Sequence, residues 1–255
     1  MKRLFFDIET SPNIGMFWRS GHKIAISYDN IIKERAIICI CWKWQGSDEV
    51  YSDTWKDDWD DRELLKNFME VAANADEIVG HNGDRFDIRW LRTRCLIHGI
   101  PAFPSYKTLD TLKKLRSGFY FNSNRLDYIG QVLGVGKKIE TSYSLWKDIC
   151  LRGCPESMTK MVDYCKEDVS LLERVYERIM PYIKHNTHSA VLSGGEKWQC
   201  PECESVNVAC NKTRTTAAGT IKREMKCGEC SKYYTISNRD YLNLLEWRQE
   251  EKNKV

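Results

Sequence analysis

Two pairs of cysteines near the C-terminal end constrain the fold more than any other feature of the sequence. Cys200-Pro-Glu-Cys203 and Cys227-Gly-Glu-Cys230 are C-x-x-C pairs separated by 23 residues, slightly more than the ~15–20 residues usual between such pairs. Four thiolates form a closed tetrahedral Zn²⁺ site with no position left for chemistry. Because so little apolar sequence surrounds them, we predict a small β unit that folds around one structural zinc.

The segments around this unit differ in composition, which indicates where domains begin and end. Apolar strands and amphipathic helices follow one another over residues 1–184, a pattern that predicts one α/β domain. Residues 185–196 are polar and contain glycines near their end, as expected of a linker. We place the cysteine-rich unit at 197–237 and expect a charged helical tail over 238–255.

Hydrophobic periodicity predicts the elements of the first domain. Asp60 and Glu63 have the spacing of a capping box at the start of a helix. The expected elements are strands at 4–9 and 77–80, a β-hairpin over 36–55, helices at 62–74, 86–97 and 156–179, and two helical pieces in 107–135 around a turn at 122–124.

Localisation and charge add few constraints. No apolar run approaches the ~18 residues that cross a membrane, and Asp7 comes too early for a secretory leader, so we expect a cytoplasmic protein with reduced thiols. The net charge of +3 neither favours nor excludes a polyanionic partner. Between Lys197 and Arg239, however, eight residues are basic and four are acidic, and Tyr233 and Tyr234 lie among them. This composition favours a nucleic-acid contact, with a protein contact as the alternative.

Asp7 and Glu9 lie two residues apart on the first predicted strand. Residues at this spacing point to the same side of a strand, and Phe6 and Ile8 point to the other. Two carboxylates on an otherwise apolar strand are costly to bury unless a cation compensates them. Hard oxygen ligands suit Mg²⁺ or Mn²⁺, so the pair predicts a divalent-metal site, with an exposed strand end as the alternative.

Further acids follow along the chain. Asp87 comes after a strand and a loop and opens a helix, so it either caps that helix or presents a carboxylate at the end of the sheet. Tyr164 and Asp168 are four residues apart and share one face of the long helix, whereas Glu167 falls on another face. Asp110 is expected to cap a helix.

In this order and spacing, these groups resemble the motifs of the DEDD superfamily of 3′–5′ exonucleases, which includes the proofreading domains of DNA polymerases. Phe5-Phe6-Asp7-Ile8-Glu9-Thr10 is similar to the first motif, Asn82-x-x-x-Phe86-Asp87 to the second in its family B polymerase form, and Tyr164-x-x-x-Asp168 to the third in its tyrosine version. The resemblance covers about residues 1–182 and extends to stand-alone exonucleases common in phages. It implies a ribonuclease-H-like fold, a mixed five-stranded sheet with helices on both faces. The cysteine pairs predict, independently of this resemblance, that the smaller unit is a zinc ribbon.

The resemblance also implies roles. Asp7 would bridge two Mg²⁺ or Mn²⁺ ions, Glu9 and Asp168 would complete the site of the ion that activates water, and Asp87 would support the other ion. Tyr164 would orient the attacking water, because a phenol with a pKa near ~10 is a poor base at neutral pH.

Three residues of the motifs are candidates for contacts with the substrate: Asn82, Phe86 and Thr10. Asn82 suits a turn equally well. For Phe86 we expect a ring packed in the core, with stacking on a base as the alternative.

The implied function is metal-dependent hydrolysis of phosphodiester bonds by a 3′–5′ exonuclease, in replication, repair or nucleic-acid turnover. The expected partner is nucleic acid, above all single-stranded DNA or DNA 3′ ends, in the cytoplasm of a bacterium or a phage-infected host. Any proofreading for a polymerase or other replication protein would occur in trans, because 255 residues leave no room for a polymerase domain. Two alternatives stay open: an exoribonuclease, since no residue identifies a 2′-hydroxyl contact, and a non-catalytic nucleic-acid-binding scaffold with the same fold.

Overall fold

The structure is a computed structural model that describes residues 1–19, 21, 25–56, 59–101, 107–184 and 187–253. The chain forms two compact units, one spanning Lys2–Val175 and the other Tyr176–Val255 with Met1. We call them the sheet unit and the ribbon unit and describe each by itself. Among the described residues, no helix has the length and apolar character required to cross a membrane.

The sheet unit is built on five strands in the spatial order β5-β4-β1-β6-β7. The central strand β1 is antiparallel to β4 and parallel to β6, and β6 is in turn parallel to β7. The bounds are β1 Arg3–Thr10, β4 Ile37–Trp44, β5 Tyr51–Thr54, β6 Glu77–Gly80 and β7 Lys107–Asp110. This mixed sheet with its helices confirms the predicted ribonuclease-H-like fold class.

Helices and short elements complete the sheet unit. The helices are α1 Arg62–Ala72, α2 Asp87–His98, α3 Thr111–Gly118, α4 Leu126–Val132, α5 Tyr143–Arg152 and α6 Pro155–Ile179, the last of which continues into the ribbon unit. A small ribbon of β2 (Ile14–Gly15) and β3 (Ile31–Lys33) and the 3-10 turn η1 (Tyr28–Asn30) follow β1.

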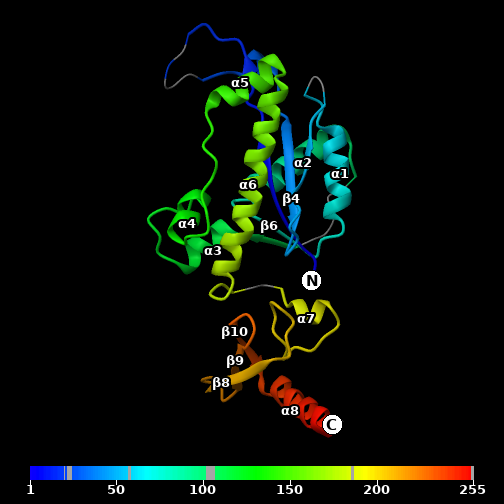
Figure 1. Ribbon diagram of the computed structural model, residues 1–255, viewed down its shortest axis with the longest axis vertical. Helices are drawn as coiled ribbons and strands as arrows, with labels where there is room; N and C mark the ends of the chain where they lie inside the picture. Colours follow the sequence, from blue (N-terminus) through cyan, green and yellow to red (C-terminus); the bar gives the residue numbers. More distant parts are fainter. Residues whose placement is uncertain (20, 22–24, 57–58, 102–106, 185–186, 254–255) are drawn as a thin grey trace. The chain divides into compact units, whose positions relative to one another are not determined.

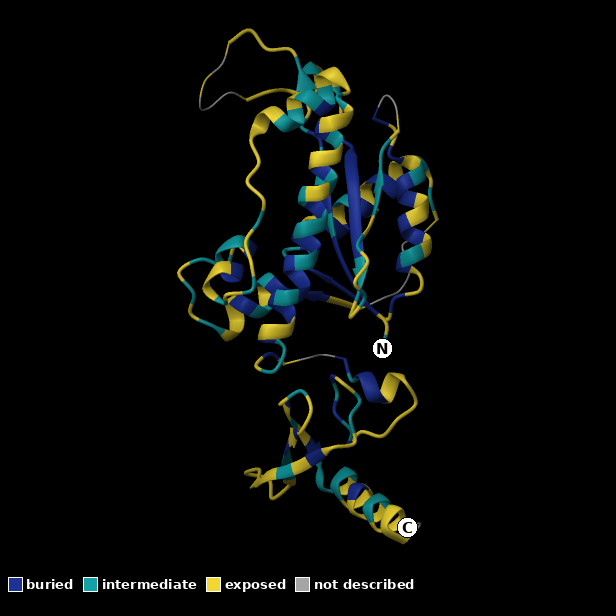
Figure 2. Cartoon of the chain, in the orientation of Figure 1, coloured by how far each residue is buried: buried dark blue, intermediate teal, exposed yellow. Residues whose placement is uncertain are grey.

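Helices cover both faces of the sheet (Figure 1). On one face, α1 and α2 pack on the apolar side chains of β1 and β4, and the Phe6 and Phe68 rings stack 5.3 Å apart. On the other face lies α6, where Lys43 Nζ of β4 is 2.5 Å from the Glu173 carboxylate. Buried residues fill the space between these layers (Figure 2). Because side chains alternate along β1, Phe6 and Ile8 point into the core, and Asp7 and Glu9 point towards α6.

Among the larger elements of the sheet unit, β7 and α5 differ from the prediction. Residues 107–110 form β7 and not the beginning of a helix, because parallel pairing with β6 supplies hydrogen bonds that a pattern of four residues does not signal. Helix α5 was not predicted at all, although Gly153 ends it in a left-handed conformation typical of helix C-termini.

The expected capping box of α1 is absent. The N-cap residue is Asp61 and makes no side-chain cap bond. Its buried carboxylate instead accepts hydrogen bonds from the Ile37 amide and the Arg94 guanidinium, which hold α1 and α2 against β4. Glu63 pairs with Lys66 at the surface. The exposed Asp60 still caps the start of α1, because its Oδ1 accepts a hydrogen bond from the Arg62 amide at 3.0 Å, and the buried ion pair of Asp61 is added to this cap.

The ribbon unit contains a three-stranded antiparallel sheet in the order β10-β9-β8, as predicted for the cysteine-rich unit. Its core contains Trp198, Met225, Ile236 and Leu244. The elements are α7 Ser189–Leu192, β8 Val208–Thr215, β9 Ile221–Cys227, β10 Tyr233–Ser237 and α8 Asn238–Asn253.

The polar segment expected as a linker contains α7. The His188 side chain accepts a hydrogen bond from the Val191 amide at the start of this helix, and Ser189 and Ala190 are buried. His185 and Asn186, which belong to the same expected linker, lie outside the described residues.

Candidate active site and cysteine cluster

Three carboxylates from β1 and α6 converge on the α6 side of the sheet. Asp7, Glu9 and Asp168 each offer an oxygen, and these oxygens lie within 4.8 Å of one another. Asp168 is buried, and the two β1 residues are half-buried. The spacing of two along β1 and the packing of α6 therefore create one site from residues that are far apart in the sequence.

Asp87 binds the backbone of the same strand. It is the first residue of α2, and its Oδ1 accepts a hydrogen bond from the Ile8 amide at 3.2 Å, between Asp7 and Glu9. The loop before it turns tightly: a Cβ on Gly83 would lie 3.2 Å from the Gly80 Cα. Gly83 permits this tight turn, which brings the buried Asp87 carboxylate to the Ile8 amide of β1, and the carboxylate does not cap its own helix.

Lys138 is a member of this site that the sequence analysis missed. Its Nζ lies 2.5 Å from Asp168 Oδ2 and 3.3 Å from the Tyr164 hydroxyl. It belongs to the loop between α4 and α5 and is held there by a hydrogen bond from its amide to Asp127 Oδ1. A lysine in a loop has no periodicity to reveal it; the signal that could have found it was the need of a buried acid cluster for a counter-charge.

Burial and neighbouring negative charges raise the pKa values of all four acids. Burial is the largest cause in each case and raises the pKa of Glu9 to about 8 and that of Asp87 to about 7. The pKa values of Asp7 and Asp168 are also raised, that of Asp7 by burial and then by the charges of its carboxylate neighbours. Burial and the Asp168 charge raise the pKa of the Tyr164 phenol, so it stays protonated at neutral pH.

The donor set fits a hard divalent cation. Lys138 supplies one positive charge against four carboxylates, and its ammonium pKa is raised by Asp168 despite the opposing effect of burial. Within the described part of the chain, the buried Asp168 Oδ1 has no hydrogen-bond partner. Clustered carboxylate oxygens with excess negative charge are the ligands that Mg²⁺ and Mn²⁺ prefer.

A basic groove of about 850 Å³ is connected to the acids through Lys138, which lines it and is paired with Asp168. Lys138 and Asn82 line it together with Arg85, Arg116 and Arg125. Asn82 has a left-handed backbone conformation (φ 67°), and its backbone N–H donates a hydrogen bond to Asp110 Oδ1 at 3.0 Å. Asn82 therefore forms the turn that was one of its two predicted roles, and it also lines the groove.

The other two candidates for substrate contact lie elsewhere. The Phe86 ring is 39% exposed and meets Trp90 edge to face, so the expectation of core packing is wrong: the ring leaves the core because Asp87, next to it, turns inward. Thr10 ends β1, accepts a hydrogen bond at its carbonyl from Trp146 Nε1, and lines a separate pocket of about 430 Å³. Asp110 accepts from the Leu112 and Lys113 amides at the start of α3, which confirms its predicted role as a helix cap.

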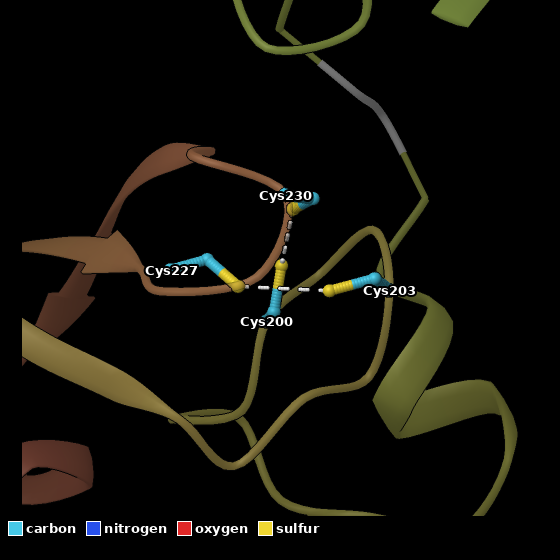
Figure 3. Close-up of side chains that lie close together, drawn as sticks. All are labelled: Cys200, Cys203, Cys227 and Cys230. Atoms are coloured by element: carbon cyan, nitrogen blue, oxygen red, sulfur yellow. Dashed lines mark hydrogen bonds between the residues drawn. The ribbon is translucent and has the colours of Figure 1, made fainter.

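Four of the five cysteines of the ribbon unit form a second cluster (Figure 3). Cys200 Sγ lies 3.5 Å from Cys230 Sγ, and Cys203 Sγ lies 3.6 Å from Cys227 Sγ. All four sulfurs lie within 4.8 Å of one another. Thiolates bound at ~2.3 Å around a tetrahedral ion are about 3.8 Å apart, so this spacing is that of a structural zinc site.

Comparisons with known proteins identify relatives of the sheet unit. The profile of the RNase_H superfamily matches residues 4–180. A DNA polymerase of Thermococcus kodakarensis is 33% identical over 102 residues, 39% of this chain and 6% of that protein, and one of Thermococcus litoralis is 34% identical over 96 residues, 37% of this chain and 5% of that protein. The chain thus corresponds to a small part of these relatives.

A solved structure shares the fold. It is that of the family B DNA polymerase from the hyperthermophilic archaeon Pyrobaculum calidifontis, with a TM-score of 0.54 and 17% sequence identity, over 71% of this chain and 24% of that one. The likeness at this identity concerns the arrangement of the sheet and its helices.

Proposed function

Because the chain belongs to the RNase_H superfamily, we propose that it is a metal-dependent 3′–5′ exonuclease that hydrolyses the phosphodiester bonds of DNA, preferably single-stranded. The observation that carries the proposal is the convergence of Asp7, Glu9 and Asp168, with Asp87 bound to the same strand. The polarity and the preference for DNA rest on the resemblance of the motifs to the exonuclease region of family B polymerases. Hydrolysis of RNA is the alternative within the same chemistry.

The acids divide into two overlapping groups of ligands. Asp7, Glu9 and Asp168 would hold one Mg²⁺ or Mn²⁺ ion, and Asp7 with Asp87 would support a second. Ions bound there lower the pKa of an attacking water and stabilise the leaving oxyanion of a phosphodiester. Burial first, and then unbalanced negative charge, raise the pKa values of the free acids, and this negative charge also favours cation binding at this position.

The remaining residues position the substrate. Tyr164 keeps its proton, so its hydroxyl acts as a hydrogen-bonding group that orients water and not as a base. Lys138 holds Asp168 in place and offsets part of its charge. Arg85, Arg116 and Arg125 give the groove a positive lining suited to phosphates, and its volume lies within the ~300–1,000 Å³ typical of ligand pockets. The four cysteines would hold one structural Zn²⁺ in the ribbon unit.

The test is a digestion assay with substrates labelled at either end. Single-stranded DNA, duplex DNA and RNA are incubated with the protein and Mn²⁺, with and without EDTA. We expect EDTA-sensitive release of nucleotides from 3′ ends, fastest on single-stranded DNA, and complete loss in Asp168→Ala. Asp163→Ala, which removes an exposed acid from the same helix, is the matched control and should remain active. Binding of DNA without hydrolysis in any metal would identify a non-catalytic scaffold instead.

A further inference from the structure

The two faces of the ribbon sheet carry different side chains. On β9, Met225 and Cys227 are buried in the core of the ribbon unit. Lys222, Glu224 and Lys226 alternate with the core-side residues and therefore lie on the opposite face. Strand pairing places neighbours from β8 and β10 beside them. We call the following set the outer face: Lys212, Arg214, Lys222, Glu224, Lys226 and Tyr233.

A β-bulge adds Lys212 to this face. Cys210 pairs with Met225 on the core side, and the register then shifts so that Lys212 pairs with Glu224. On a regular strand without this register shift, Lys212 would share the core side with Cys210, because residues two apart point the same way. The irregularity therefore turns a lysine towards the other cations.

The outer face is strongly positive. Its one carboxylate, Glu224, is bound by the Arg214 guanidinium at 2.9 Å, and this bond lowers the pKa of Glu224. Three lysines are left: Lys212, Lys222 and Lys226. In the part of the chain that the structure describes, none of them forms an ion pair. Lys226 Nζ lies 5.6 Å from the centre of the Tyr233 ring, which is itself exposed.

From this arrangement we infer that the outer face binds the sugar-phosphate backbone of nucleic acid, a role that rests on the proposed exonuclease function and adds a second binding surface to it. Lys222 and Lys226 are about 14 Å apart along β9, and each strand of a DNA duplex presents about four phosphates over that length of the helix axis. Tyr233 offers an exposed ring on which a base can stack. An acidic polypeptide would match the charge but would leave the ring without a partner.

The inference is tested by the salt dependence of binding. Fluorescence anisotropy of a labelled oligodeoxynucleotide is measured with the full chain and no added Mg²⁺ or Mn²⁺, so that binding is read without hydrolysis. Replacing Lys212, Lys222 and Lys226 by glutamine should reduce the slope of log affinity against log salt by about 2, at about 0.7 per phosphate contact on a single strand. The matched control removes equal charge elsewhere in the ribbon unit through Lys197→Gln, Arg239→Gln and Lys252→Gln and should keep the wild-type slope.

A second variant acts in the opposite direction. Glu224→Gln removes the one acid of the outer face and releases Arg214, so it should strengthen binding and steepen the slope, which a merely misfolded ribbon unit would not do. An unchanged slope in the triple glutamine variant overturns the inference, even if nucleotide release shows that the exonuclease proposal is right. Conversely, if the variants show the expected salt slopes but the protein releases no nucleotide with any metal, only the exonuclease proposal is contradicted. Displacement of the oligonucleotide by poly-glutamate at equal charge would identify an acidic polypeptide as partner and also overturn it.

Discussion

The ammonium of Lys138 lies 2.5 Å from Asp168 Oδ2, so a loop between two short helices supplies positive charge to acids that come from β1, α2 and α6. This ion pair connects the loop between α4 and α5 to the long helix α6. It also lowers the pKa of Asp168, Asp7 and Glu9 relative to what burial and repulsion alone would produce.

Replacing Lys138 by methionine should move the pH dependence of nucleotide release to higher pH. Without the ammonium, the pKa values of the acids rise further, so they stay protonated, and unable to bind metal, up to a higher pH. A nearby opposite charge shifts a pKa by about 1–3 units, and we expect the acidic limb of kcat/KM at fixed Mn²⁺ to move up by about one unit. Lys137→Met, an exposed neighbour, is the control. An acidic limb at the wild-type pH would show that Lys138 does not act on these acids.

Asp7→Asn should abolish nucleotide release and at the same time stabilise the metal-free protein. The folded-state pKa values of Glu9 and Asp87, about 8 and about 7, exceed their ordinary values, so the folded state binds protons more tightly than the unfolded state. Stability without metal therefore falls as pH rises from about 4 to about 8. The amide removes one repelling charge, and the melting temperature at pH 8 should rise by on the order of a few degrees. Thermal melting at pH 5 and pH 8, with and without Mn²⁺, checks this; a lower melting temperature than wild type at pH 8 would refute it.

Tyr164→Phe should slow nucleotide release about tenfold and leave its pH profile unchanged. The raised pKa of the phenol means that no proton leaves it between pH 5 and 9, so only an orienting hydrogen bond is lost. Loss of a general base would instead cost about 10²–10⁴-fold. Rates measured across this pH range separate the two: a drop of that larger size with a missing limb would make the tyrosine a base.

The site residues on regular strands and helices could be predicted from the sequence, but the one in a loop could not. Asp7 and Glu9 could be assigned because a two-residue period fixes the face of a strand, and Tyr164 with Asp168 because a four-residue period fixes the face of a helix. Lys138 obeys no period, and its position depends on the amide bond to Asp127 and the packing of the loop. Strand β7 was missed for the same reason: it is a strand because it pairs with β6, and its composition does not indicate this pairing.

Cys227→Ser should remove zinc from the ribbon unit, and Cys210→Ser should not. Both cysteines lie in the same small sheet, but only Cys227 belongs to the group of four sulfurs within 4.8 Å. Three thiolates leave a tetrahedral site open, and the folding free energy that the metal provides is lost with it. Zinc analysis of the purified variants should give about one ion per chain for wild type and Cys210→Ser. Equal zinc in both variants would place the ion elsewhere.

Arg94→Met should destabilise the sheet unit by about 3–5 kcal/mol, because it leaves a buried carboxylate without its main partner. Asp61 is fully buried; it accepts from Arg94 Nε at 2.7 Å and from the Ile37 amide at 2.9 Å, and its Oδ1 lies 2.5 Å from His98 Nε2. These bonds keep its pKa below the usual value although burial acts to raise it. Adding Asp61→Asn should recover part of the loss, since the buried charge that has lost Arg94 is then gone while an oxygen still faces the Ile37 amide. Lys66→Met, which breaks an exposed ion pair with Glu63, is the control and should cost about 0–1 kcal/mol. The check is urea unfolding of the three variants, and a loss for Arg94→Met no larger than for Lys66→Met would show that the pair does not support the fold.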